Sequence, residues 1–481
     1  MLGFEPASAP PTDMKKNLRL PPGPRLLSYP RRWLLYTRDQ ERFYLGMREE
    51  FGPIVRLPMD PLLTRMAYVV SEPALVKHYL IDNAANYTKN FFAGRRDIVA
   101  GEAVSTSEGT FWRRHRRLVQ PAFQRDWMSS QVPRMVDAVR RYLERYWDVY
   151  AREGQPVDML REMSRLNLCL LGPIVFSQDP SEELRDALYT YYIDAIRERT
   201  TGEFIASLLL PGHVQYLIKK RRQPAYFPSA ELVDRFARGL VAQRRQSPDA
   251  HDDMLARVMA ARDEKGEGLD DLEVRDELVD IFYGGHVSST ATMAWAWYCL
   301  ATLPEVNARV VDEVEQVLHG RSPTAADLPR FQYTTRVMEE TFRKYPPAPG
   351  LIRVALKDDQ IAGYDVPAGT VVGASSFVMH NHPDYWARPS AFDPDHFLPE
   401  VVERRPKFVY IPFGGGQRLC IGERLAMMMS SIILSLVSQR YRVSLVPGLE
   451  VKGVKGGVYH PQNLLMRIER AERPARAVPA A

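Results

Sequence analysis

A glycine-rich loop that ends in one cysteine constrains this chain more than any other feature. The segment Phe413–Gly422 reads FGGGQRLCIG, and its three consecutive glycines cannot sustain the interior of a helix or strand. Such a backbone can approach a flat or bulky group closely. Cys420 stands directly before a predicted helix, 422–440, whose N-terminal N–H groups and dipole would stabilise a thiolate. A single stabilised thiolate, with no second Cys or His nearby in the sequence, suits an axial ligand of haem iron.

The alternative is a buried structural cysteine, which is the interpretation we prefer for Cys169 and Cys299 because both lie on apolar predicted helices. The spacing F-x-x-G-x-R-x-C-x-G decides the matter for Cys420. A chance match to its five fixed positions in 481 residues has a probability on the order of 10⁻⁴. With three cysteines and no C-x-x-C, the chain also has neither a disulfide framework nor a zinc ribbon.

The loop resembles the haem-binding loop of the cytochrome P-450 family, and all five positions match. The resemblance implies haem b (iron protoporphyrin IX), with the Cys420 thiolate as axial metal ligand and as a catalytic residue. It also implies that Arg418 pairs with a haem propionate and that Phe413 shields the ligand from water. Gly416 and Gly422 complete the cofactor-binding loop.

Two further motifs extend the resemblance over nearly the whole chain. Glu340 and Arg343 match E-x-x-R, and because they lie three residues apart on a predicted helix they can form an ion pair. The segment 392–397 resembles the family's meander, which supplies a basic residue to this pair. Here His396 takes the place of the commoner Arg, so its charge in the structural ion pair would depend on pH.

A third motif, W-x-x-x-R, is matched by Trp112 and Arg116, which as helix positions i and i+4 face the same way. The resemblance implies that these two side chains bind one propionate and that Arg353 supplies another propionate contact. Without the other motifs, the basic run around Arg116 would be interpreted as a solvated helix face.

The family places a long helix across the oxygen-binding face of the haem, and the predicted helix over 271–303 matches it. Its GGHVSS stretch begins at Gly284, and the glycine pair would let the helix open locally, with Gly285 as a cofactor-binding position. Val287 replaces the usual acid. Ser288 takes the threonine position and is our candidate for proton delivery.

The loss of the acid at Val287 leaves three activities open. The enzyme can hydroxylate with protons carried by ordered water, by His286 or by the substrate; it can be driven by peroxide; or it can catalyse an isomerisation or dehydration at the haem. We favour the first because Ser288 retains a hydroxyl, although that hydroxyl could instead bond back to its own helix. His286 on an apolar helix is more simply a core residue. A non-catalytic helical scaffold is disfavoured by the intact cysteine loop.

The rest of the sequence predicts a mainly α fold with small β-sheets and without a break between domains, and the resemblance implies the cytochrome P-450 fold. We expect a Pro-rich segment over 1–30 and a single haem-thiolate monooxygenase domain over 31–481. Hydrophobic residues make up 45% and charged residues 26% of the chain, which excludes wholesale disorder. Further helices are predicted over 37–51, 73–83, 109–119, 131–152, 157–176, 181–198, 229–246, 251–264, 304–319 and 330–344, and short strands over 54–57, 65–70, 350–374 and the tail.

The stretch Ile281–Pro304 contains no charged residue and is long enough to span a bilayer. Its glycines, serines and threonines crowd into one half, which favours a buried core helix. No targeting segment is visible, so we expect a soluble, cytoplasmic, bacterial-type protein without an integral membrane segment. The Pro-rich start also resembles the hinge after the membrane anchor of microsomal members. The net charge of +5 gives no argument for nucleic acid.

Family topology implies that the substrate pocket is lined by the segments 91–106 and 203–228 together with Val287, Leu351, Ile352 and Val458. These residues are mainly apolar, so we expect an apolar small-molecule substrate of secondary metabolism: a terpenoid, a fatty acid or a polyketide.

Electrons would come from a separate ferredoxin or flavodoxin-type donor with its reductase, because no flavin or iron–sulfur segment follows the cysteine loop. A basic patch would attract such an acidic donor and would weaken with salt. We predict that this patch consists of Arg113, Arg114, Arg117, Arg404, Arg405 and Lys407.

Overall fold

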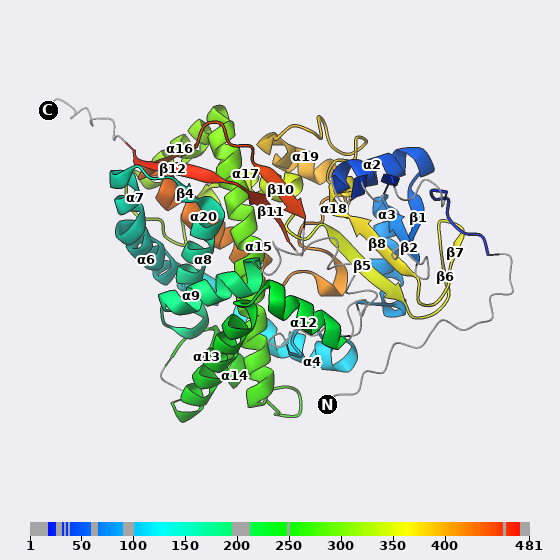
Figure 1. Cartoon of the computed structure of the whole chain (residues 1–481), viewed down its shortest axis with the longest axis horizontal. Coiled ribbons are helices and arrows are strands. Elements are labelled where there is room, and N and C mark those ends of the chain that lie inside the picture. Colours follow the sequence, from blue (N-terminus) through cyan, green and yellow to red (C-terminus); the bar gives the residue numbers. More distant parts are fainter. Residues whose placement is uncertain are drawn as a thin grey trace.

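The computed structural model describes residues 18–25, 31–32, 35–36, 39–58, 66–89, 101–194, 212–247, 251–455 and 458–471. Helices form most of this part of the chain (Figure 1). The α-helices are α2 (Gln40–Phe51), α3 (Pro73–Lys77), α4 (Gly109–Val119), α5 (Arg125–Ser130), α6 (Val132–Tyr142), α7 (Asp148–Glu153), α8 (Met159–Phe176), α9 (Glu182–Tyr189), α12 (Gly212–Arg222), α13 (Tyr226–Gln246), α14 (Met254–Ala260), α15 (Asp271–Thr302), α16 (Pro304–Leu318), α17 (Gln332–Lys344), α18 (Ser376–Met379), α19 (Pro399–Arg404) and α20 (Glu423–Ser438).

The strands are short and come mainly from the two ends of the chain. They are β1 (Ile54–Pro58), β2 (Met66–Val70), β3 (Tyr87–Thr88), β4 (Val157–Asp158), β5 (Gly350–Ala355), β6 (Asp359–Ile361), β7 (Tyr364–Val366), β8 (Val371–Ser375), β9 (Tyr441–Leu445), β10 (Lys452–Lys455), β11 (Tyr459–Gln462) and β12 (Leu465–Arg470). Of the Pro-rich segment predicted over 1–30, all but 18–25 lies outside the described residues.

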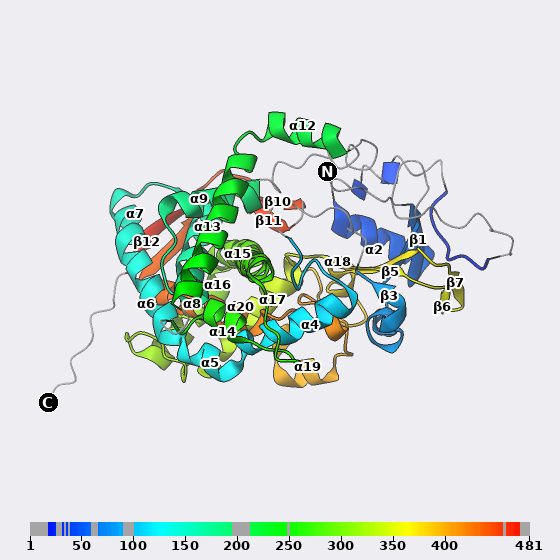
Figure 2. The same cartoon turned by 90° about the horizontal axis from the view of Figure 1, so that it is seen from below.

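The long helix α15 runs through the centre of the molecule, and in Figure 2 it is seen nearly end-on among the other helices. It starts at a capping box, in which the Asp270 carboxylate accepts from the Glu273 N–H and the Glu273 carboxylate accepts from the Asp270 N–H. Its second half is buried on most sides, and the helix packs against α8, α13 and α17. This is the buried core helix that the sequence predicted. Within the described residues, no helix combines the length and apolar content that crossing a membrane requires.

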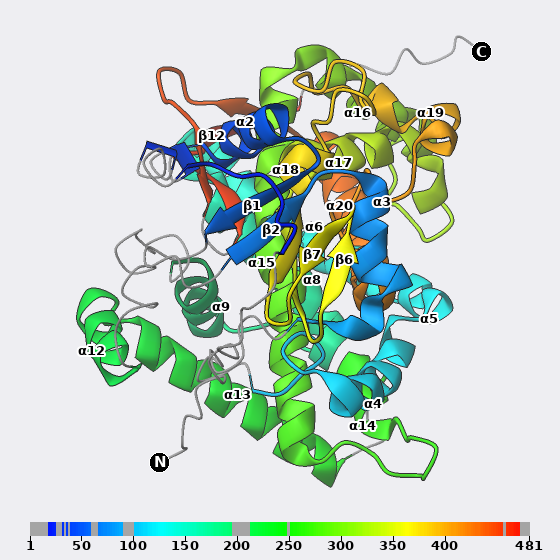
Figure 3. The ribbon, with the colours of Figure 1, turned by 90° about the vertical axis from the view of Figure 1, so that its right-hand side faces the viewer.

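A five-stranded sheet that contains β1 and β2 lies beside the helices (Figure 3). Its strand order is β1-β2-β8-β5-β3. All its pairings are antiparallel except β2 with β8, which are parallel. All five residues of β8 are buried because the strand lies inside the sheet. Its pairing with β5 sets Arg353 opposite Val372 and fixes which side chains of β5 point toward the helices.

The predicted fold class, mainly α with small sheets, is confirmed, and the helix predicted over 109–119 is α4 with the same bounds. Two predicted helices are wrong in detail. The one over 131–152 is interrupted by a π-helical turn at Leu143–Trp147, which the spacing of apolar residues does not reveal. The one over 251–264 is the shorter α14, because the Asp253 carboxylate accepts from the Ala256 N–H and caps the helix there.

Candidate active site

The cysteine loop is held by its own backbone. Gly414 and Gly416 have φ angles of 79° and 69°, in the left-handed region that glycine adopts without strain. A Cβ atom on Gly416 would lie 2.3 Å from the backbone oxygen of Leu80, so no side chain fits there. The N–H of Cys420 donates to the Phe413 carbonyl at 3.0 Å and closes the loop. Glycine is therefore required at 416 both by the backbone conformation and by the close approach of a second segment.

Cys420 is exposed, whereas the other two cysteines of the chain are buried. Nearby protein still displaces enough water to raise the pKa of its thiol. The backbone N–H groups of Gly422 and Glu423 and the charge of Arg116 oppose this rise without overcoming it. The helix N-terminus therefore favours the thiolate, as the sequence predicts, but burial outweighs it. A metal ion bound to Cys420 would supply further positive charge, because coordination deprotonates a thiol.

Three arginines and one indole converge beside this loop from three different elements. Arg116 on α4 is half-buried and Arg353 on β5 is 8% exposed, and among the described residues neither has a carboxylate partner. Arg353 instead donates to the Ile352 carbonyl at 2.8 Å. Burial lowers the pKa of both guanidinium groups, because it disfavours their charged form. The buried Nε1–H of Trp112 finds no acceptor within the described residues.

Arg418 differs from the other two arginines because it already has an anion beside it. Its Nη2 lies 2.7 Å from the Glu108 carboxylate and 3.0 Å from the Ser107 carbonyl, and its guanidinium stacks 3.8 Å from the Trp112 ring. Burial lowers the pKa of Arg418 to about 10, and Glu108 limits the fall. The sequence missed Glu108, since no motif marks an acid directly before α4.

On α15, the glycine pair serves two different purposes. A Cβ atom on Gly285 would lie 3.2 Å from the Leu171 side chain of α8, so the space beside Gly285 is filled by another helix. Gly284 differs, because a Cβ atom there would meet nothing within 4 Å. The assignment of Gly285 to cofactor binding stays a prediction. The Ser288 hydroxyl is half-buried and donates to the Gly284 carbonyl at 2.9 Å, which is the bond back to its own helix.

The predicted pocket residues fall into two groups. Val287 and Val458 line one small apolar cavity, together with Leu160, Tyr192, Ile193, Ala291 and His460. Leu351 lies instead against the cysteine loop, 3.5 Å from the Cβ position of Gly414, and Ile352 lies against Gly373. Of the predicted pocket segments, residues 91–100 and 203–211 lie outside the described residues.

His286 is a core residue. It is fully buried, and its Nε2 lies 2.7 Å from the Ser164 hydroxyl of α8. Burial lowers its pKa to about 3, so the imidazole is neutral at physiological pH. The minor alternative, a role for His286 in carrying protons, is opposed by this position and charge.

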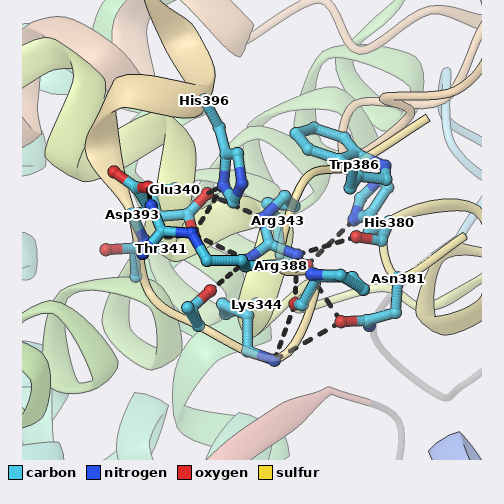
Figure 4. A network of polar contacts seen from close by, with 12 residues as sticks. Glu340, Thr341, Arg343, Lys344, His380, Asn381, Trp386, Arg388, Asp393 and His396 are labelled. Carbon is cyan, nitrogen blue, oxygen red and sulfur yellow. Dashed lines mark hydrogen bonds and ion pairs between the residues drawn. The ribbon is translucent and has the colours of Figure 1, made fainter. Parts of the chain in front are cut away.

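Glu340 and Arg343 form a fully buried ion pair near the end of α17 (Figure 4). Arg343 Nε and Nη2 donate to the two carboxylate oxygens at 2.7 and 2.6 Å. The guanidinium also donates to the backbone carbonyls of residues 380, 389 and 391 at 2.6 to 2.8 Å. The pair therefore fastens the segment 380–391, which leads toward the cysteine loop, onto α17.

The structure brings His396 to this pair, where the sequence expected it. Its Nδ1 lies 3.3 Å from each carboxylate oxygen of Glu340, and its Nε2 faces the Ala387 carbonyl (Figure 4). The ring therefore lies between the Glu340 carboxylate on one side and a backbone carbonyl on the other. The Asp393 N–H donates to Glu340 at 2.7 Å and completes the set of donors around this carboxylate.

The predicted basic patch is smaller than expected and is divided. Three of its six cations are engaged within the chain: Arg114 by Asp263 and Glu273, Arg117 by Glu264, and Arg405 by the ring of Trp386. Arg113, Arg404 and Lys407 stay exposed. In Figure 3, α4, which carries Arg113, and α19, which ends at Arg404, lie well apart along one side of the molecule.

Comparison with known proteins identifies the relatives of this chain. The family model described as cytochrome P450 matches residues 21–468. Cyclooctat-9-en-7-ol 5-monooxygenase of Streptomyces melanosporofaciens is 30% identical over 84% of this chain and 85% of its own length. Pentalenene oxygenase of Streptomyces avermitilis is 28% identical over 88% and 92%. The solved structure of cyanobacterial CYP120A1 with bound retinoic acid covers 95% of this chain and 100% of its own, with a TM-score of 0.79 at 23% identity.

The residues around the loop fit a haem. A flat group with two carboxylates would meet Arg116 and Arg353, whose buried charges lack carboxylate partners among the described residues, and could accept from the orphaned Trp112 Nε1–H. Cys420 offers an accessible sulfur beside them. A Cβ atom on Gly422 would lie 4.0 Å from the Cys420 sulfur, so this glycine stands directly beside the sulfur.

The buried network on α17 predicts a large loss of stability in Arg343→Ala. Removing the guanidinium leaves the Glu340 carboxylate buried without its cation, which costs about 3–5 kcal/mol. We expect a much lower denaturation midpoint and little haem incorporation, measured by chemical denaturation and by the haem-to-protein ratio. Arg140→Ala, which breaks an exposed pair with Asp137, is the control and should change stability little, because solvent screens such pairs. Equal losses in both variants would contradict this assignment.

Proposed function

This chain belongs to the cytochrome P450 family and is a haem-thiolate monooxygenase, and from that premise we propose that Cys420 is the axial ligand and that the substrate is an apolar terpenoid. The observation that carries the proposal is the exposed cysteine beside two buried arginines that lack carboxylate partners within the described residues. Support for the substrate class comes from relatives named for oxygenating cyclooctat-9-en-7-ol and pentalenene, and from the apolar cavity beside Val287.

The bound haem supplies insertion of one atom of dioxygen into a substrate bond, while the second atom leaves as water at the expense of two electrons and two protons. In our proposal this chain binds the haem and controls the delivery of protons to it. Arg116, Arg353 and Trp112 bind the propionates. Arg418 shares its charge between a propionate and Glu108. Phe413 packs against Phe342 of α17, with ring centroids 4.8 Å apart, and helps to keep water from the sulfur.

We place proton delivery at Ser288. Its hydroxyl donates to the Gly284 carbonyl, so passing a proton outward requires that this bond be exchanged for one to water. Val287 faces an apolar cavity, and His286 is neutral, so neither side chain relays protons. Ordered water must therefore connect Ser288 to solvent. The second candidate function, a peroxide-driven enzyme, is favoured by this same lack of an acid at Val287.

The donor of electrons in this proposal is a ferredoxin or flavodoxin with its reductase, and the site of action is the cytoplasm. Arg113 on one side and Arg404 with Lys407 on the other would steer an acidic partner.

Reversing these three charges should slow reduction by the donor at low salt, and the difference from wild type should shrink at high salt. A reduction rate that depends neither on these three charges nor on the salt concentration would show that this surface does not bind the donor.

The carbon monoxide complex of the reduced protein tests the ligand. We expect the red-shifted Soret band of a thiolate-ligated haem, and its complete loss in Cys420→Ser. Cys299→Ala, which changes a buried cysteine of α15, is the matched control and should keep the band. A red-shifted band in Cys420→Ser would refute the assignment of Cys420 as the ligand.

In the wild-type protein, pentalenene should shift the ferric spin state at a lower concentration than palmitic acid does. The reverse order would refute the terpenoid class.

Val287→Glu tests proton supply. A carboxylate at the usual acid position should raise the fraction of electrons recovered in product, by up to roughly tenfold where proton delivery limits coupling. Val287→Gln adds a similar volume without the acid and should leave coupling at the wild-type level or below it. Wild-type turnover with peroxide alone, and none with a reductase system, would favour the second candidate function instead.

A further inference from the structure

A buried charged cluster joins α4 to α15 on the helix that carries the propionate anchors. His115 of α4 has no exposed side-chain area. Its Nδ1 lies 2.7 Å from the Glu277 carboxylate and its Nε2 lies 3.2 Å from the Glu273 carboxylate, and both acids belong to α15. The Phe111 ring stacks on the imidazole at 3.9 Å. We call His115, Glu273 and Glu277 the α4–α15 clasp.

The clasp has the geometry of a charged histidine. A neutral imidazole would turn the lone pair of one nitrogen toward a carboxylate oxygen, whereas an imidazolium donates from both nitrogens. Glu277 is 1% exposed, and His115 is the cation that the structure places against it. Glu273 also receives Arg114 at 3.1 Å, so this acid is held between two donors.

His115 lies on α4 between Trp112 and Arg116, the two residues that we propose bind haem propionates, so the clasp affects haem binding. His115 lies three residues after Trp112 and directly before Arg116, so its ring fixes how the helix is rotated about its axis. Rotation decides whether the Trp112 Nε1–H and the Arg116 guanidinium face the cysteine loop. The ion pair between Arg117 and Glu264 on α4 is solvent-exposed and holds the helix weakly, whereas the pairs of Arg114 with Asp263 and Glu273 are partly buried and act beside the clasp.

We infer that His115 is a positioning residue, kept as an imidazolium between Glu273 and Glu277, and that this charge holds Trp112 and Arg116 in place to retain the haem. The inference rests on the proposed function, because it assumes that these two side chains bind propionates. It adds to that function a residue that does not touch the cofactor and a dependence of cofactor retention on pH.

The direction of the pH dependence follows from the groups around the ring. Burial alone lowers the pKa of His115, but the hydrogen bonds and charges of Glu277 and Glu273 outweigh it and raise the pKa above 6.5. The stabilisation from the clasp is therefore complete below the unfolded pKa of about 6.5 and is lost as pH rises through the higher folded value. The charged groups that face the clasp are Arg114 on α4, Glu273, Glu277 and Asp280 on α15, and Asp263 through its pair with Arg114.

Transfer of haem from the purified holoprotein to an excess of apomyoglobin tests the inference, with the rate measured as a function of pH. In wild type the rate should be lowest below about pH 6.5 and should rise as the pH increases above it. His115→Gln should lose haem about tenfold faster at the lower pH, with the rise removed. His115→Lys, which keeps a cation, should hold the haem and restore a low rate. Arg117→Gln is the control on the same helix and should behave as wild type.

Two further results separate positioning from general destabilisation. Glu277→Gln should speed haem loss as His115→Gln does, and the double variant should be no faster than either single one, because each removes the same interaction. His115→Gln with the wild-type rate and the wild-type pH profile would overturn the inference. If His115→Gln does not fold, Glu277→Gln and His115→Lys decide: a wild-type rate in the first, or fast loss in the second, overturns it. A wild-type protein purified without haem would instead refute the proposed function.

Discussion

The structure depends on positive charge that is gathered around the cysteine loop in excess of the carboxylates beside it. Arg116 and Arg353 have no carboxylate partner among the residues that the structure describes, and Arg418 has Glu108. The half-buried Arg116 and the buried Arg353 therefore lie beside the loop without a paired carboxylate. In the proposed arrangement the two haem propionates would pair with them, and iron bound to Cys420 would favour the ionised thiolate. The cofactor would then contribute to the electrostatic balance of the fold.

Buried charged side chains on three helices, α4, α15 and α17, hold the segments around the cysteine loop in position. On α17, Glu340 and Arg343 hold the segment that precedes the cysteine loop. On α4, His115 faces Glu277 of α15 and orients the side chains next to it. Because buried pairs fail badly when one partner is removed, these contacts fix geometry more than they add net stability. Val287 and Ala291 of α15 line the small apolar cavity, and the same helix carries Ser288.

The sequence predicted correctly what local chemistry decides. The left-handed φ angles of Gly414 and Gly416 are ones that glycine adopts without strain, and α4 has the predicted bounds. The sequence could not show what distant segments contribute. The Leu80 backbone approaches Gly416, Leu171 of α8 lies beside Gly285, and acids far along the chain engage Arg114, which was expected on a docking patch. Burial raises the pKa of Cys420 and opposes the effect of the helix N-terminus, because desolvation is a property of the folded surroundings.

The central claim is a bond between the sulfur of Cys420 and haem iron, and X-ray absorption at the iron edge of the purified ferric protein tests it directly. The account predicts one sulfur among the atoms bound to iron in the wild-type protein, and none in Cys420→His, where a nitrogen donor takes its place. Iron bound by nitrogen and oxygen alone in the wild type, or a sulfur that persists in Cys420→His, would contradict it.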